Sequence, residues 1–202
     1  MSTKNNIKIE HAVLTFRNFG GERKRFNDEG KRNFCVYLDG YNYRGEAFKN
    51  EEMIPRYKYG SDWLNPNDLI PALEADGWNV KFTKEGLDES GEVRYPSRPY
   101  IQVHVKYSEL YPRYNPSVYL VKSNGDLTKL DEDSVEQLDR TWIANADLII
   151  KPNNYDERKG NPDGKVSADL QTIYVKPVED MDEDDFDGKY SRTISDQEDM
   201  PW

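Results

Sequence analysis

Apolar and polar side chains alternate in short runs along the chain, which is the two-residue period of a β-strand. An Asn-Gly pair at 124–125 lies between two of these runs, as in a tight hairpin turn. The alternation predicts strands at residues 7–16, 34–38, 78–82, 100–107, 117–121, 127–130, 147–151 and 169–175.

Two segments have helical rather than strand spacing. Residues 65–77 begin with prolines and end at a glycine, and residues 131–140 have acids in the first turn and an arginine in the last. With about eight short strands and no alternation of strand and helix, the pattern predicts a mainly β fold. We expect an antiparallel barrel or sandwich, and specifically an OB-fold-like antiparallel barrel with long loop insertions and one or two short helices.

Four long loops interrupt this pattern, at residues 17–33, 39–64, 83–99 and 152–168. Long loops on a small β scaffold usually carry function. The periodicity stops after Pro177, and the remaining residues are highly charged and poor in apolar side chains. The sequence therefore predicts a folded domain at 1–177 and a disordered acidic C-terminal tail at 178–202.

The net charge of the 202-residue chain is −10, but it is unevenly placed. Residues 179–202 contain ten acids and two bases, a net −8, which leaves −2 for the rest of the chain. An acidic protein is a poor candidate for nucleic-acid binding when its charge is read as a whole. Here the acidity argues only that the tail does not contact nucleic acid.

Few residues in this sequence could support catalysis or hold a metal. The chain has one cysteine and two histidines, and it has no HExxH, GxxxxGK[ST] or GxSxG motif. We expect no enzyme activity, no metal site and no cofactor. The apolar runs are too short to span a membrane and the N-terminus does not resemble a signal peptide, so we expect a soluble intracellular protein.

Basic and aromatic residues cluster in the predicted loops and at strand ends. Residues 17–33 (RNFGGERKRFNDEGKRN) have six bases, three acids and two phenylalanines. A single strand of nucleic acid requires this combination, cations for phosphates and flat rings for bases. The predicted nucleic-acid-binding residues are Arg17, Phe19, Arg23, Lys24, Arg25, Phe26, Lys31, Arg32, Tyr41, Tyr43, Arg44, Tyr57, Lys58, Tyr59, Arg98, Tyr100, Lys106, Tyr107, Tyr111, Arg113 and Tyr114.

A structural interpretation of each of these residues stays open. Basic loop residues are often only solvated, and a strand tyrosine is often half-buried in the core. The stretch KRFNDEGKR could also be the tip of a two-stranded ribbon with paired charges and no ligand.

The last residues, SDQEDMPW, combine acids with a final apolar pair and an aromatic residue. Such a segment suits a partner with a basic rim and an apolar pocket. It resembles the tip of bacterial single-stranded DNA-binding proteins, with Trp in place of the usual terminal Phe and a Gln among the acids. The predicted partner-binding residues are Asp196, Glu198, Asp199, Met200, Pro201 and Trp202.

The segments RNFGGERKRFNDEGKRNFCVYL and LEADGWNVKF are similar to those of bacteriophage single-stranded DNA-binding proteins. The family is similar in plan to the phage T7 and bacterial single-stranded DNA-binding proteins, with an OB-like nucleic-acid-binding domain and an acidic tail that ends in an aromatic. This resemblance implies binding of single-stranded DNA in phage replication, recombination or repair, in the cytoplasm of the infected bacterial host. It also implies that the tail recruits replication or recombination proteins.

Other functions stay open at this point. An acidic phage protein could instead be a DNA mimic that inhibits a host nuclease or restriction system, although mimicry needs acids on a rigid surface. An adaptor could use the same aromatic surfaces for protein contacts. Edge strands could also pair copies of the chain as a homo-oligomer.

Overall fold

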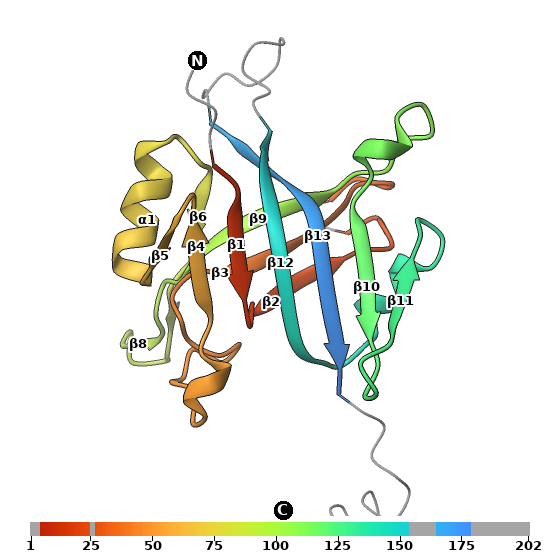
Figure 1. Cartoon of the computed structure of the whole chain (residues 1–202). Helices are drawn as coiled ribbons and strands as arrows, with labels where there is room; N and C mark the ends of the chain where they lie inside the picture. The colour runs from red at the N-terminus through yellow and green to blue at the C-terminus, as the bar shows by residue number, and fades with distance from the viewer. Residues whose placement is uncertain (1–4, 25–26, 154–164, 179–202) are drawn as a thin grey trace, which may run out of the picture.

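Figure 1 shows the computed structural model of the chain, which describes residues 5–24, 27–153 and 165–178. The strands are β1 (Ile7–Glu10), β2 (Leu14–Asn18), β3 (Arg32–Tyr37), β4 (Arg56–Tyr59), β5 (Asp62–Leu64), β6 (Val80–Phe82), β7 (Gly86–Leu87), β8 (Val93–Tyr95), β9 (Pro99–Val105), β10 (Ser117–Val121), β11 (Leu127–Leu130), β12 (Ile143–Asn153) and β13 (Ser167–Pro177). The helices are α1 (Pro66–Ala75) and the 3₁₀ turns η1 (Glu51–Met53), η2 (Pro112–Tyr114) and η3 (Val135–Asp139).

Eleven strands form one sheet, in the order β2-β3-β9-β13-β12-β1-β4-β5, and β7 and β8 form a separate two-stranded ribbon. β6 joins this sheet beside β9, and β10 joins it beside β13 and carries β11 on its other side. The pairings of β13 with β9 and with β10 are parallel, and the other pairings within the sheet are antiparallel.

The sheet folds over on itself around a single core. β13 pairs with β9 through only two residues, Ala168 and Asp169. In Figure 1, β1, β4, β10, β12 and β13 cross in front of β2, β3 and β9. Apolar side chains from both layers meet between them and are fully or nearly fully buried, including Ile9, Phe34, Val103, Leu148 and Ile173.

Local sequence determines where the elements begin and end. The Asn65 side chain accepts a hydrogen bond from the Asp68 backbone N–H, and Pro66 follows at the first position of α1, a common helix start. The helix ends before Gly77, whose φ of +78° a residue with a Cβ would adopt only at a cost. In β12, residues 146, 148 and 150 are buried and the residues between them are half-buried, as expected for a strand with one face toward the core.

The prediction of a mainly β fold is confirmed, and its finer description as an antiparallel barrel is corrected. The described strands form no closed barrel, and two pairings are parallel. The parallel pairings arise because β13 is long. Its first half lies beside β9 and its second half lies beside β10, both at the edge of β13 opposite to β12.

Other expectations about single elements also change. The predicted strand 7–16 is two strands separated by a bend at His11, and the predicted helix at 131–140 is the short 3₁₀ turn η3. The predicted loops 39–64 and 83–99 contain β4, β5, β7 and β8. The predicted tail lies outside the described residues except for Val178, so its disorder and the domain division stay predictions.

Candidate nucleic-acid interface

A groove of about 500 Å³ lies where the β1–β2 connection, β2, the 42–53 segment and the start of β12 meet. Its lining residues are 11–17, 42, 43, 48, 53 and 142–145. We call it the aromatic groove, because three of its lining side chains are highly exposed rings. Phe16 and Tyr43 are each 65% exposed, and Trp142 is 83% exposed. Exposed rings gathered around one groove are the surfaces on which bases of a single strand stack.

Phe16 points outward because β2 has a bulge. Thr15 pairs with Cys35 and Asn18 pairs with Asn33, so Phe16 and Arg17 together lie opposite the single residue Phe34. Phe16 also has a φ of +48°, an uncommon conformation for a bulky residue. Bulges redirect side chains, and strained backbone is often found at functional sites. The local geometry of β2 therefore places a strained, exposed ring at the groove.

Trp142 is held by its backbone while its indole stays exposed. The backbone N–H of Val178, just after β13, donates to the Trp142 carbonyl at 2.8 Å. The Arg17 Nη1 donates to the carbonyls of Leu138 and Thr141, each at 2.7 Å, which fixes the segment that leads into Trp142. Burial lowers the pKa of Arg17, and the nearby Asp139 opposes this effect. Because arginine stays protonated in proteins, Arg17 keeps its positive charge at the groove.

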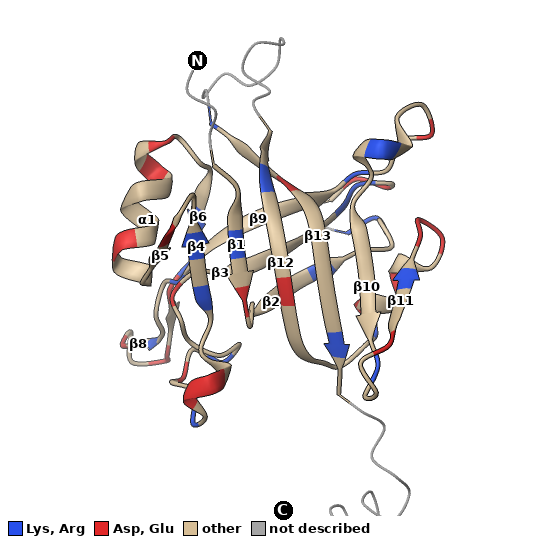
Figure 2. Ribbon diagram, viewed as in Figure 1, with Lys and Arg blue, Asp and Glu red and all other residues tan. Residues whose placement is uncertain are grey.

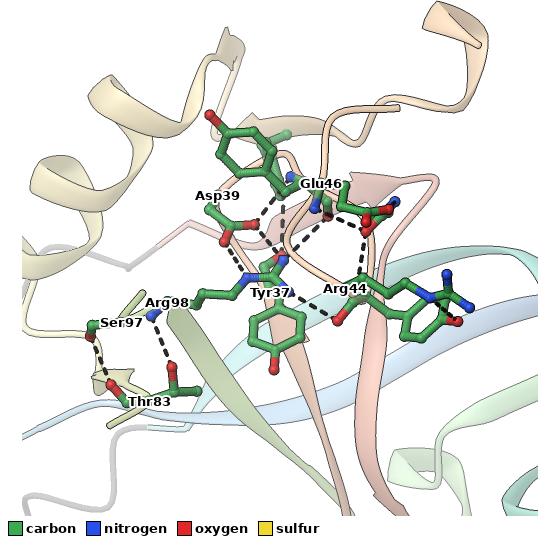
Figure 3. Close-up of polar contacts among 11 residues, drawn as sticks. Tyr37, Asp39, Arg44, Glu46, Thr83, Ser97 and Arg98 are labelled. Atoms are coloured by element: carbon green, nitrogen blue, oxygen red, sulfur yellow. Dashed lines mark hydrogen bonds and ion pairs between the residues drawn. The ribbon is translucent and has the colours of Figure 1, made fainter. Parts of the chain in front are cut away.

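The third ring, Tyr43, is carried by a loop that a buried ion pair supports (Figure 3). Arg98 donates to both carboxylate oxygens of Asp39, at 2.6 and 2.9 Å, and its guanidinium lies 3.6 Å from the centroid of the Tyr37 ring. The same guanidinium donates to the carbonyls of Tyr41 and Tyr43. Arg98 is only 8% exposed. It is therefore a support for the 39–46 loop rather than an exposed phosphate contact.

Two further predicted cations lie beside the groove. The Lys24 ammonium donates to the Arg17 carbonyl at 2.9 Å, at the β2 side. Arg44 lies 5.3 Å from the centroid of the Tyr43 ring and donates to its hydroxyl. With Arg17, these residues place three cations close to three exposed rings. Tyr41, on the same loop, is 48% exposed.

The rest of the 17–33 segment is a hairpin whose charges are partly paired. Arg23 is exposed, Lys31 pairs with Asp28, and Arg32 pairs with Glu132 and lies over the Tyr107 ring. Lys24 and Asn27 form an isolated bridge close to the tip. The predicted residues Arg25 and Phe26 lie outside the described residues. The described part of this segment therefore has partly paired charges, and Arg23 and Lys24 are exposed.

A second cluster forms at 106–114 and does not line the aromatic groove. Tyr111 and Tyr114 are each 58% exposed, their centroids are 6.4 Å apart, and Arg113 lies over the Tyr114 ring. Lys106 pairs with Asp169. A small cavity of about 150 Å³ lies beside Lys106, Tyr114 and Lys151. The predicted site residues thus do not all lie at the aromatic groove.

Several predicted residues are buried. Phe19 is fully buried and stacks on Phe34 with centroids 4.9 Å apart, and Tyr57 and Tyr59 are core residues of β4. Burial raises the pKa of Tyr59 to about 12. Its hydroxyl donates a hydrogen bond to the Asp76 carboxylate and accepts one from the Trp78 indole N–H. Their rings are not exposed for stacking in this structure, so we leave them out of the candidate interface. Tyr100, Tyr107 and Lys58 are half-buried.

Sequence reasoning missed Phe16 and Trp142, two of the three highly exposed rings of the groove, and it included the third, Tyr43. Phe16 ended a predicted strand, and its exposure depends on a bulge that alternation does not show. Trp142 lies between η3 and β12, and because the predicted strand began only at residue 147, nothing in the alternation indicated an exposed ring at this position. Among the described residues, no three His, Cys, Asp or Glu side chains gather as metal ligands would, and no helix there is long and apolar enough to cross a membrane.

A family model described as "Putative phage ssDNA-binding domain" matches residues 1–50 and 42–200 of the chain. No curated protein and no solved structure matches. The match covers nearly the whole sequence, including the aromatic groove and the 106–114 cluster. This agrees with the resemblance seen in the sequence, and the chain therefore belongs to the phage single-stranded DNA-binding domain family.

Proposed function

We propose that the protein binds single-stranded DNA without sequence preference and that the aromatic groove is the central contact. The observation that carries this proposal is the gathering of Phe16, Tyr43 and Trp142 around one groove with Arg17, Lys24 and Arg44 beside it. Every base has a flat face, so stacking on such rings tolerates any sequence. The family match supports single-stranded DNA as the ligand.

The family and the tail sequence also support a finer role. We propose a role in phage DNA replication, recombination or repair, in the cytoplasm of the bacterial host, as a binding protein rather than an enzyme. Residues 196–202 would recruit partner proteins, because they combine acids with a terminal apolar and aromatic group. A homo-oligomer is compatible with the fold, since β2 and β5 each have one neighbour at the ends of the main sheet path.

A titration with labelled oligonucleotides tests the binding function. Single-stranded DNA, duplex DNA and single-stranded RNA would be compared at two salt concentrations. We expect preferential, salt-sensitive binding to single-stranded DNA, with a slope of about −0.7 per neutralised phosphate. Absence of binding, even after removal of residues 179–202, would refute the proposal and favour a DNA mimic or an adaptor.

A variant tests the groove itself. Trp142→Ala removes the most exposed ring and should weaken single-strand binding by about 1–3 kcal/mol, the usual value of one stacked base. Phe82→Ala is the matched control, because Phe82 is 53% exposed on β6 and does not line the groove. Equal affinities of the two variants would exclude the groove as the main contact.

A further inference from the structure

A second group of cations surrounds an exposed tryptophan on the outer face of the sheet. Trp63 on β5 is 44% exposed. Arg56 lies 4.4 Å from the centroid of its ring, and the ammonium groups of Lys58 and Lys8 lie 5.9 and 6.0 Å from it. We call these four residues the Trp63 patch. It contains Lys58, one of the residues predicted from the sequence to bind nucleic acid.

The pairing of three strands builds this patch. Lys8 on β1 pairs with Lys58 on β4, and Lys58 pairs with Trp63 on β5. Residues directly opposite one another in antiparallel strands share a face. The neighbours Ile7, Ile9, Tyr57 and Tyr59 point into the core, so this row points outward. Figure 2 shows the basic positions of β1 and β4 beside each other.

Most of the positive charge in the patch is not cancelled by ion pairs. Glu10 contacts both Lys8, at 3.3 Å, and Arg56, at 3.2 Å, while Lys58 has no ion pair with a described residue. One carboxylate therefore faces three cations. An aromatic ring attracts a cation through its quadrupole without neutralising it. Asp62 is opposite Tyr59 in the pairing and so lies on the other face of β5.

The Trp63 patch and the aromatic groove include residues that are close together in the chain. Met53 lines the groove, and Arg56 follows three residues later at the start of β4. On the neighbouring strand, His11 lines the groove, and the adjacent Glu10 contacts Arg56 and Lys8. The groove and the patch are therefore neighbours along β1 and along the 53–56 segment, with the Glu10 carboxylate at their junction.

We propose that single-stranded DNA bound in the aromatic groove continues onto the Trp63 patch, where its phosphates contact Lys8, Arg56 and Lys58. This inference rests on the proposed function. Stacking in the groove supplies the base contacts, and the patch supplies electrostatic attraction that does not depend on sequence. Trp63 acts as a positioning residue that keeps the three cations together. The patch consequently extends the length of DNA that one protein molecule covers.

The test compares oligonucleotides of about 4 and about 16 nucleotides, the range of site sizes known for small single-strand-binding folds. The variant Lys8→Gln/Lys58→Gln removes two cations of the patch. Lys122→Gln/Lys129→Gln is the control with the same charge change, on exposed positions of the β10–β11 hairpin. Affinities would be measured by fluorescence anisotropy from 20 to 200 mM salt.

We expect the patch variant to bind the long oligonucleotide more weakly than the control does, and the short one equally well. Loss of two phosphate contacts should reduce the salt slope for the long oligonucleotide by about 1.4. The ratio of the variant's Kd to that of the wild type should then shrink by about 25-fold over a tenfold rise in salt. Trp63→Phe should retain most of this binding, and Trp63→Ala should lower the salt slope as the lysine variant does.

The outcomes separate this inference from the proposed function. If the patch variant and its control bind the long oligonucleotide equally while Trp142→Ala weakens binding, the DNA does not reach the patch and the groove proposal stands. The same result is expected if the patch binds an acidic protein segment instead. If the wild type binds neither oligonucleotide, both proposals are overturned.

Discussion

Phe16 has both an unusual backbone conformation and an exposed ring that the proposed function uses. Its φ of +48° is a strained conformation for any residue with a Cβ, so alanine at this position would be strained as well and glycine would not. The ring is 65% exposed, so little core packing compensates this cost. A strained residue with an exposed side chain is consistent with selection for the ring itself rather than for stability.

Two substitutions at this position separate stability from binding. Phe16→Ala and Phe16→Gly both remove the ring and should weaken single-stranded DNA binding by about 1–3 kcal/mol. Phe16→Gly also removes the strain of a positive φ on a residue with a Cβ. Its free energy of unfolding should therefore be higher than that of Phe16→Ala, by about 1 kcal/mol. Urea denaturation and oligonucleotide titration measure the two quantities. A Phe16→Gly variant that binds like the wild type would show that the ring is not a stacking surface.

Most of the strands could be predicted from the sequence, because alternation is a local property. The runs at 34–38, 100–107, 117–121, 127–130, 147–151 and 169–175 all lie within or overlap β3 and β9 to β13. β4 and β5 were missed because their basic and aromatic residues were interpreted as loop residues. The groove could not be predicted as a unit. It brings residues 11–17 next to 142–145, and this proximity depends on the pairing of β1 with β12.

Arg98 shows why residue type alone does not distinguish a contact residue from a supporting one. It was predicted to contact nucleic acid, and the structure buries it under the loop that carries Tyr43. A basic residue in a loop can support an interface as well as form it. The two roles can be distinguished only when the position of its partner, Asp39, is known.

A double-mutant cycle between Arg98 and Tyr43 tests this supporting role. Arg98→Ala leaves the largely buried Asp39 carboxylate without its partner and should lower the free energy of unfolding, by up to about 3–5 kcal/mol. If Arg98 acts through the loop, Tyr43→Ala should weaken DNA binding much less in the Arg98→Ala background than in the wild type. Additive losses in affinity would indicate that Arg98 contacts the DNA directly.

The β9 strand carries a group that should make stability depend on pH. Burial lowers the pKa of His104. The nearby charges of Lys106, Lys81 and Lys31 lower this pKa further, and the charge of Asp169 opposes them. The unfolded chain therefore binds a proton at a higher pH than the folded chain does. Stability from this group is present above its ordinary pKa of 6.5 and is lost as the pH falls toward the lower folded value.

The variant His104→Gln removes this titration and should flatten the pH dependence of stability below about pH 6.5. Urea denaturation at several pH values between 7 and 5 measures the effect. The wild type should lose stability over this range, and the variant should lose less. Parallel profiles for the two proteins would show that His104 does not contribute.

At the scale of the whole molecule, charge separates the chain into two parts. Residues 179–202 have a net charge of −8 and the rest of the chain −2, while the described surface carries basic residues at the aromatic groove and at the Trp63 patch. A segment with this density of negative charge resembles a run of phosphates. It can therefore occupy the same cations when DNA is absent and compete with DNA when DNA is present.

Removal of residues 179–202 should raise the affinity for single-stranded DNA and abolish recruitment of partner proteins. The gain should be larger at 10 mM than at 100 mM salt, because the Debye length falls from about 30 to about 10 Å over this range. A full-length variant with the ten tail acids changed to Asn or Gln is the matched control. It should reproduce the gain in affinity if the effect is electrostatic. An affinity that stays the same or falls after removal would contradict competition by the tail, and the tail would then act on partners alone.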